Sequence, residues 1–314
     1  MAFDAQDVAH KLSNRLKMRH LALLLQIRQH GSLTRAAEYM AISQPALTNT
    51  LTELEGMFGA PLFDRSVRGM SPTPLGRVVL AHAQAMIQDL DHLVRDMDAM
   101  ASGHTAHLRI GVTPFVPGRV IPTAVQQAER DGRHLTVTVS EGPAELLLTQ
   151  LLDHTLDIVV GQASPVFSQD GLGFDALYSQ APRLVANRRL AARLTRHRLD
   201  WPRLASLDWI MSPATSYLRE QVASLFVEAG LPVPRPVVET DVTRIIGEML
   251  AASERTVCIL PADMAEELVR VAGVVIIPYT FAWNLPPIGF FTRYSGTPRM
   301  AEQWFAEALR KASR

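Results

Sequence analysis

The sequence has little cysteine, no excess of charge and no long apolar run, and each absence excludes a class of protein. Cys258 is the one cysteine among 314 residues, so no intrachain disulfide is expected and a reducing compartment is favoured. No stretch approaches the ~18–20 apolar residues of a membrane span, and residues 1–20 lack the apolar segment of a signal peptide. We therefore expect a cytoplasmic protein without a membrane segment, and a buried Cys258 in its apolar run.

The net charge is zero, which alone would argue against a nucleic-acid-binding protein, but the charges are unevenly distributed. Residues 8–80 hold nine basic and four acidic side chains, a net charge of +5. Acidic residues follow directly, at Asp89, Asp91, Asp96 and Asp98. A basic segment on an otherwise neutral chain is typical of a DNA-binding domain joined to a sensor domain.

Catalytic and metal-binding patterns are missing from the sequence. We find no Ser-His-Asp order and no nucleotide-binding loop. His104 and His107 lack a cysteine or carboxylate at ligand spacing, so a polar linker is expected there. Asp153 and Asp157 flank a turn and are expected to cap it rather than to act as an acid–base pair. The sequence thus predicts no catalytic residue, no metal and no cofactor.

Residues 31–55 predict two short helices joined by a tight turn. The first has a buried face of apolar residues at helical spacing, namely Leu33, Ala36, Ala37 and Met40. The second has its own, namely Leu47, Leu51 and Leu54. Ser43 can cap the second helix, and Pro45 fits its first turn. The outward face holds short side chains suited to base edges in a major groove, namely Gln44, Pro45, Thr48, Asn49 and Thr52.

Five short motifs follow one another between Gly31 and Gly76. They are Gly31-Ser32-Leu33-Thr34-Arg35-Ala36-Ala37, Ser43-Gln44-Pro45-Ala46-Leu47-Thr48, Leu54-Glu55, Leu62-Phe63-Asp64-Arg65 and Thr73-Pro74-Leu75-Gly76. In this order the region resembles the DNA-binding domain of the LysR-type transcriptional regulators, and several ordered matches within roughly 45 residues are more specific than one motif. Three positions depart from the family: Leu33 replaces an aromatic residue, Asn49 a basic residue and Pro72 a leucine.

The resemblance implies a winged helix-turn-helix domain at residues 18–76, after an N-terminal extension at 1–17. Residues 63–73 predict the two-stranded wing, in which Arg65 and Arg68 would contact phosphates or the minor groove, or Arg65 would instead hold the wing through an ion pair. The extension could be a helix packed on a partner subunit or a polar extension. The predicted DNA-binding residues are Thr34, Arg35, Ser43, Gln44, Pro45, Thr48, Asn49, Thr52, Arg65 and Arg68.

Residues 74–100 predict one long linker helix that begins at Pro74. Its apolar residues alternate in spacings of four and three, which favours a dimerising coiled coil over the alternative of a single core helix. The predicted dimerisation residues are Val79, Ala83, Met86, Leu90, Leu93 and Met97.

From residue 107 onward, strand and helix patterns alternate, which predicts an α/β domain with a parallel sheet. Strands are expected at 107–113, 135–140, 156–161, 183–187, 209–211, 237–239, 256–260, 274–277 and 287–292. Helices are expected at 120–130, 144–153, 218–229, 243–252, 262–269 and 299–311. The arrangement resembles the effector-binding half of the same family, which is two-lobed like periplasmic binding proteins. His154 and Thr256 stand where that family usually has glycine.

The resemblance implies a lobe I at residues 107–179 and 284–314 and a lobe II at 183–280, with hinges near 180–182 and 281–286. Ligands of open α/β sheets bind at the carboxyl ends of strands and at helix N-termini. The predicted effector-binding residues there are Thr113, Pro114, Phe115, Glu141, Gly161, Ser212, Pro213, Thr215 and Thr240. The hydroxyl groups of Thr113, Ser212, Thr215 and Ser216 favour an anionic ligand or act as helix caps. The acidic Glu141 and Asp241 would instead reject anions or select a hydroxylated or amine-bearing ligand. The effector stays unassigned.

Together these features predict a LysR-type regulator whose promoter binding is modulated by a small molecule held between the two lobes. The implied partners are double-stranded promoter DNA and further copies of the chain, in a dimer or tetramer, with RNA polymerase as a candidate. Two alternatives remain: a winged-helix regulator with an unrelated sensor, such as a molybdate-type regulator, and an enzyme fused to a DNA-binding module. Strand–helix alternation and the absence of a catalytic pattern favour the first hypothesis.

Overall fold

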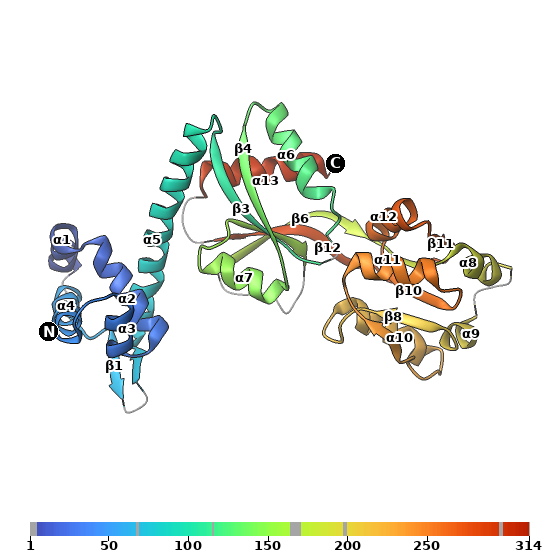
Figure 1. The fold of residues 1–314 in the computed structure, drawn as a ribbon, viewed down its shortest axis with the longest axis horizontal. Helices are drawn as coiled ribbons and strands as arrows, with labels where there is room; N and C mark the ends of the chain where they lie inside the picture. Colours follow the sequence, from blue (N-terminus) through green and yellow to red (C-terminus); the bar gives the residue numbers. More distant parts are fainter. Residues whose placement is uncertain are drawn as a thin grey trace. The chain divides into compact units, whose positions relative to one another are not determined.

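A computed structural model describes residues 5–66, 69–114, 116–163, 171–196, 200–294 and 298–313. The chain divides into two compact units (Figure 1). The first holds Met1–Ser102 with Asp153–Thr155, and the second holds Gly103–Leu152 with Leu156–Arg314. Over the part of the chain that is described, none of the helices is both long and apolar enough to cross a membrane.

The first unit consists of helices and one two-stranded hairpin. Its elements are α1 (Ala5–Arg15), α2 (Met18–His30), α3 (Leu33–Tyr39), α4 (Gln44–Phe58), β1 (Phe63–Ser66), β2 (Gly69–Pro72) and α5 (Pro74–Ala101). The predicted helix-turn-helix, wing and long helix are therefore confirmed. The N-terminal extension forms a helix whose Leu12, together with Leu16 just beyond it, packs against the core of this unit. The extension thus packs on its own chain.

Local chemistry explains where these helices begin and end. Gly31 ends α2 with a left-handed φ of 61°, and its N–H donates to the carbonyl of Ile27 at 2.9 Å. Ser43 begins α4, because its Oγ accepts from the N–H of Ala46 at 3.3 Å. Thr73 caps α5 by accepting from the N–H of Gly76 at 2.9 Å. A Cβ on Gly76 would lie 1.9 Å from the carbonyl oxygen of Leu62, so the close approach of these two segments requires glycine.

Lobe I, in the second unit, is a five-stranded sheet in the order β4-β3-β5-β12-β6. Its strands are β3 (Ala106–Val112), β4 (Leu135–Glu141), β5 (Ile158–Gln162), β6 (Leu172–Gln180) and β12 (Leu285–Arg293). Helices α6 (Val120–Arg130) and α13 (Met300–Ala312) lie side by side over one face (Figure 1). Helix α7 (Ala144–Leu152) covers the other face.

Lobe II is a second five-stranded sheet, in the order β11-β7-β10-β8-β9. Its strands are β7 (Pro182–Ala186), β8 (Asp208–Met211), β9 (Pro236–Glu239), β10 (Thr256–Pro261) and β11 (Val275–Ile277). One face packs against α8 (Arg188–Leu194), α9 (Trp201–Ala205) and α10 (Tyr217–Glu228). The other packs against α11 (Thr243–Ala252) and α12 (Ala262–Ala272). Cys258 is buried there, and burial raises the pKa of its thiol to about 12.

The predicted parallel pairing is found in both lobes, for β3 with β4 and β5 and for β8 with β9 and β10, but each sheet also contains antiparallel pairs. β12 runs antiparallel to β5 and β6, and β7 runs antiparallel to β10 and β11. The cause is the double crossing between lobes: a chain that arrives from the other lobe enters the sheet at the carboxyl edge of its parallel strands and must run backwards. Strand β6 and the short helices α8 and α9 were not predicted; β6 is an edge strand without regular alternation of buried and exposed residues.

Candidate DNA-binding face and effector site

Helix α4 presents a polar face on the side opposite its apolar residues. Leu47, Leu51 and Leu54 are fully buried in the core of the first unit. The predicted DNA-binding residues of this helix and its cap are exposed or, for Thr48, half-buried, and they are Ser43, Gln44, Pro45, Thr48, Asn49 and Thr52. Thr34 and Arg35 of α3 and Arg65 of β1 are exposed as well, whereas Arg68 lies outside the described residues.

Hydrogen bonds within α4 decide what this face can offer to a base edge. The hydroxyl of Thr48 donates to the carbonyl of Gln44 at 2.9 Å, and that of Thr52 donates to the carbonyl of Thr48 at 3.0 Å. These threonines therefore present methyl groups and acceptor lone pairs, although Thr48 Oγ1 also accepts from Gln44 Nε2 at 3.4 Å. The amides of Gln44 and Asn49 supply both donors and acceptors, the pattern that pairs with adenine. Ser43 differs, because its side chain already serves as the helix cap.

Glu55 holds the start of the wing in place. The sequence analysis included this residue in a family motif but assigned it no role. The Glu55 carboxylate accepts from the backbone N–H groups of Leu62 at 2.8 Å and Phe63 at 3.3 Å. This contact fixes the turn between α4 and β1. For Arg65, by contrast, no ion pair is found among the described residues, and its side chain is exposed.

The predicted dimerisation residues on α5 fall into two groups. Val79 and Ala83 are buried within the first unit, where α5 packs on α2, so their assignment to an intersubunit seam is wrong. The remaining four are exposed apolar side chains: Met86, Leu90, Leu93 and Met97. The heptad spacing continues across both groups because they lie on the same helix. Its first part packs in the core of the first unit, and its later part is exposed.

In lobe I, the predicted effector-binding residues meet at the carboxyl edge of β4, β3 and β5. Thr113 is buried, and its N–H donates to the carbonyl of Val160 at 3.0 Å. A Cβ on Gly161 would lie 2.6 Å from the Thr113 hydroxyl oxygen, so Thr113 fills the space that this glycine leaves. Pro114 follows directly, and Glu141, exposed, ends β4 beside Val112. Phe115 lies outside the described residues.

In lobe II, the predicted residues meet at the carboxyl ends of β8 and β9. Ser212 is buried after β8, and the N–H of Thr240 donates to the carbonyl of Met211 at 3.0 Å, which brings these segments together. Pro213 and the exposed Thr215 follow Ser212. Thr240 Oγ1 accepts from the N–H of Val242 at 3.1 Å in a local turn, and α11 begins after Val242 without a side-chain cap.

Direct contacts between the lobes involve Gln180, in a predicted hinge, and two residues that the sequence analysis missed, Arg119 and Asp263. Arg119 Nη2, at the start of α6, donates to Asp263 of α12 at 2.9 Å, and Gln180 Nε2 donates to the same carboxylate at 3.1 Å. Burial alone would raise the pKa of Asp263, but hydrogen bonds from Arg119 and Gln180 hold it below its ordinary value. Charged residues at helix starts carry no sequence pattern that would have revealed this pairing.

Three buried polar atoms near this contact have no hydrogen-bond partner among the described residues. They are Gln162 Nε2, Tyr178 Oη and Gln180 Oε1. Gln162 and Tyr178 flank Ile288 in register across β5, β12 and β6. Burial raises the pKa of the Tyr178 hydroxyl, and the nearby Asp263 carboxylate adds to this effect without a well-aligned hydrogen bond. Of these three residues, only Gln162 could have been predicted as a site residue from its sequence position, because it directly follows Gly161 at the end of β5.

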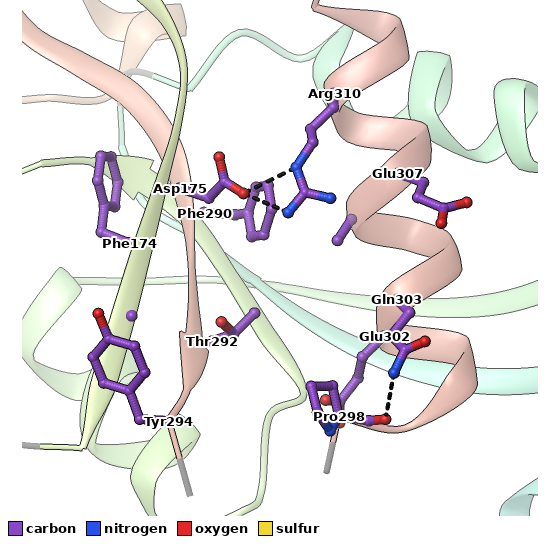
Figure 2. Close-up of a pocket in the computed structure, with 12 residues that line it drawn as sticks. Phe174, Asp175, Phe290, Thr292, Tyr294, Pro298, Glu302, Gln303, Glu307 and Arg310 are labelled. Atoms are coloured by element: carbon purple, nitrogen blue, oxygen red, sulfur yellow. Dashed lines mark hydrogen bonds and ion pairs between the residues drawn. The ribbon is translucent and has the colours of Figure 1, made fainter. Parts of the chain in front are cut away.

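A separate groove of about 410 Å³ lies on lobe I between β6, β12 and α13 (Figure 2). Arg310 Nε donates to Asp175 at 2.9 Å, and the guanidinium lies 5.4 Å from the centre of the Phe290 ring. The other charged lining residues, Glu302 and Glu307, pair with Arg293 and Arg133. The charges of this groove thus join α13 to the sheet strands β6 and β12 and, through Arg133, to the segment that follows α6. The described residues contain no cluster of three or more metal-ligating side chains.

Comparison with known proteins agrees with these features. Residues 18–77 match the family model for the bacterial regulatory helix-turn-helix protein, lysR family, and residues 101–314 match that for the LysR substrate binding domain. The HTH-type transcriptional regulator GbpR of Azospirillum brasilense is 25% identical over 280 residues, covering 89% of this chain and 82% of GbpR. The match at 101–314 shows that the alternative of an unrelated sensor is wrong.

Two solved structures show the same fold. Full-length CbnR complexed with its target DNA aligns with a TM-score of 0.55 and 19% identity, over 95% of this chain and 100% of that one. Full-length LysG from Corynebacterium glutamicum with bound effector Arg aligns with a TM-score of 0.61 and 19% identity, over 95% and 98%. With a lysR-type helix-turn-helix and a LysR substrate-binding domain in one chain, this protein belongs to the LysR family of transcriptional regulators.

Proposed function

We propose that this regulator binds double-stranded promoter DNA through α4 and the wing, and that a small molecule between lobes I and II modulates the binding. The observation that carries the proposal is the exposed polar face of α4, on a helix whose other face is buried. The CbnR–DNA complex, of the same fold, supports the DNA part. The LysG structure with bound Arg supports the effector part.

We propose the domain limits expected from the sequence: an extension at 1–17, a DNA-binding domain at 18–76, a linker helix at 74–100, lobe I at 107–179 and 284–314, and lobe II at 183–280. Self-association through the exposed part of α5 would give a dimer, and a pair of dimers a tetramer. RNA polymerase is a candidate further partner. We also infer a cytoplasmic location and a regulatory rather than catalytic role.

The effector part of the proposal rests on where the lobes face each other. The contact of Arg119 with Asp263 joins the start of α6 to the start of α12, next to the strand ends that carry Thr113 and Ser212. Gln162 offers a free donor, and Gln180 a free acceptor, among the described residues. A small polar molecule with both donors and acceptors fits this environment. A bound ligand should raise the thermal stability of the wild-type protein more than that of a Gln162→Leu variant. An equal rise in both would place the ligand at another site.

The first test is DNA binding by gel shift to the segment upstream of the protein's own gene, at two salt concentrations and with a scrambled competitor. Because Gln44 would read base edges, Gln44→Ala should lower specific affinity by about 1–3 kcal/mol, roughly five- to 150-fold. Gln29→Ala, an equally exposed glutamine on α2, is the matched control and should bind as wild type. Unchanged affinity of Gln44→Ala would remove this residue from the readout.

A further inference from the structure

One carboxylate joins the two lobes of the effector-binding domain. Asp263, in the first turn of α12 in lobe II, accepts from Arg119 Nη2 at 2.9 Å and from Gln180 Nε2 at 3.1 Å. Arg119 directly precedes α6 of lobe I, and Gln180 is the last residue of β6, where the chain leaves lobe I. Two separate elements of lobe I therefore contact the same side chain of lobe II.

The environment of Asp263 favours a firm contact. Its side chain is 14% exposed, whereas that of Arg119 is 55% exposed, so the carboxylate is the anchored partner. A negative charge in the first turn of a helix is further stabilised by the helix dipole. The backbone next to it is also fixed, because the N–H of Ala262 donates to the carbonyl of Ala181 at 2.9 Å. Asp263 thus lies directly beside the crossing from β6 to β7.

The same place holds unused hydrogen-bonding capacity. Tyr178 Oη and Gln180 Oε1 are buried and have no partner among the described residues. Leaving buried polar groups unpaired is costly, so an arrangement of the lobes that pairs them would compete with the one described here. The three-residue contact and these two atoms therefore lie at the crossing point on which a change in the angle between the lobes would act.

We propose that Asp263 is a positioning residue that holds the two lobes in one arrangement through Arg119 and Gln180, and that effector binding acts by changing these contacts. The link to the effector rests on the proposed function. The restraint on the hinge does not, since it concerns contacts within the second unit. Removing the carboxylate or the guanidinium should therefore loosen the two crossing segments, whether or not DNA or effector is present.

The test is amide hydrogen exchange of the full-length protein, followed by mass spectrometry over residues 179–183 and 278–285. Asp263→Asn and Arg119→Gln should each raise exchange there by roughly threefold or more, as local opening becomes easier. The exchanged pair, Arg119→Asp with Asp263→Arg, should return it toward wild type. Glu307→Gln is the matched control, because it breaks an ion pair of 2.7 Å with Arg133 inside lobe I and should leave both segments unchanged.

Two results would overturn the proposal. One is exchange in Asp263→Asn equal to that of the Glu307→Gln control. The other is failure of the exchanged pair to reverse the effect of the single variants, which would indicate a local structural role. Binding of the wild-type protein to its operator is measured on the same samples. Absence of specific DNA binding would count against the proposed function, while the exchange data would still decide whether Asp263 restrains the hinge.

Discussion

At the scale of single residues, Gly161 and Thr113 share one small space at the ends of β5 and β3. A Cβ at 161 would approach Thr113 Oγ1 to 2.6 Å and its Cγ2 to 2.8 Å. Gly161→Ala should therefore displace Thr113 and lower the free energy of unfolding by about 1–3 kcal/mol, measured by urea denaturation. Gly142→Ala is the control, since its nearest contact would be 3.7 Å. Equal stability of the two variants would contradict this account.

His154 shows how a departure from the family pattern appears in the backbone. It stands where the family usually has glycine, and its φ is 59°, in the left-handed region that side chains disfavour. His154→Gly should be more stable than His154→Ala by about 0.5–1 kcal/mol, because both lose the imidazole and only glycine relieves the strain. Thermal unfolding of the two variants measures the difference. A more stable alanine variant would exclude backbone strain as the dominant effect.

At the scale of elements, α5 changes role along its length. Val79 and Ala83 belong to the core of the first unit, while Leu90 is 46% exposed. If the exposed stretch pairs with a second copy, Leu90→Asp would bury two charges in the seam and should convert the dimer to monomers. Analytical ultracentrifugation reports the mass. Leu146→Asp, at a comparably exposed leucine of α7, should leave it unchanged, and a persistent dimer of Leu90→Asp would place the interface elsewhere.

At the scale of the whole molecule, the contact between the lobes makes stability depend on pH. The pKa of Asp263 is lower in the folded protein than its ordinary 3.8, so the ionised carboxylate stabilises the fold above that pH. The contribution is lost as the pH falls through the folded-state pKa. Asp263→Asn should therefore cost about 1–2 kcal/mol at neutral pH, discounted for the exposure of Arg119, and progressively less below 3.8. Urea denaturation across this range measures it, and a constant difference would contradict the assignment.

The sequence by itself determined the elements that depend on neighbouring residues. The cap at Ser43, the helix start at Pro74 and the apolar spacing of α4 depend on a few neighbouring positions, so the sequence was enough to predict them. The strands and helices of both lobes followed from the same local patterns, except for β6, α8 and α9. The DNA-binding, effector-binding and remaining dimerisation residues stay predictions, because they concern partners.

Only the tertiary structure decided which apolar surfaces are buried within their own unit and where the two lobes contact each other. Val79 and Ala83 fit the heptad pattern as well as Leu90 does, but packing on α2 buries them. The direction of β12 and β7 depends on two crossings between lobes rather than on their side chains. Arg119 and Asp263 are 144 positions apart, and no local periodicity connects residues at such a distance. Contacts of this kind depend on the path of the whole chain, and so they appear only once it has folded.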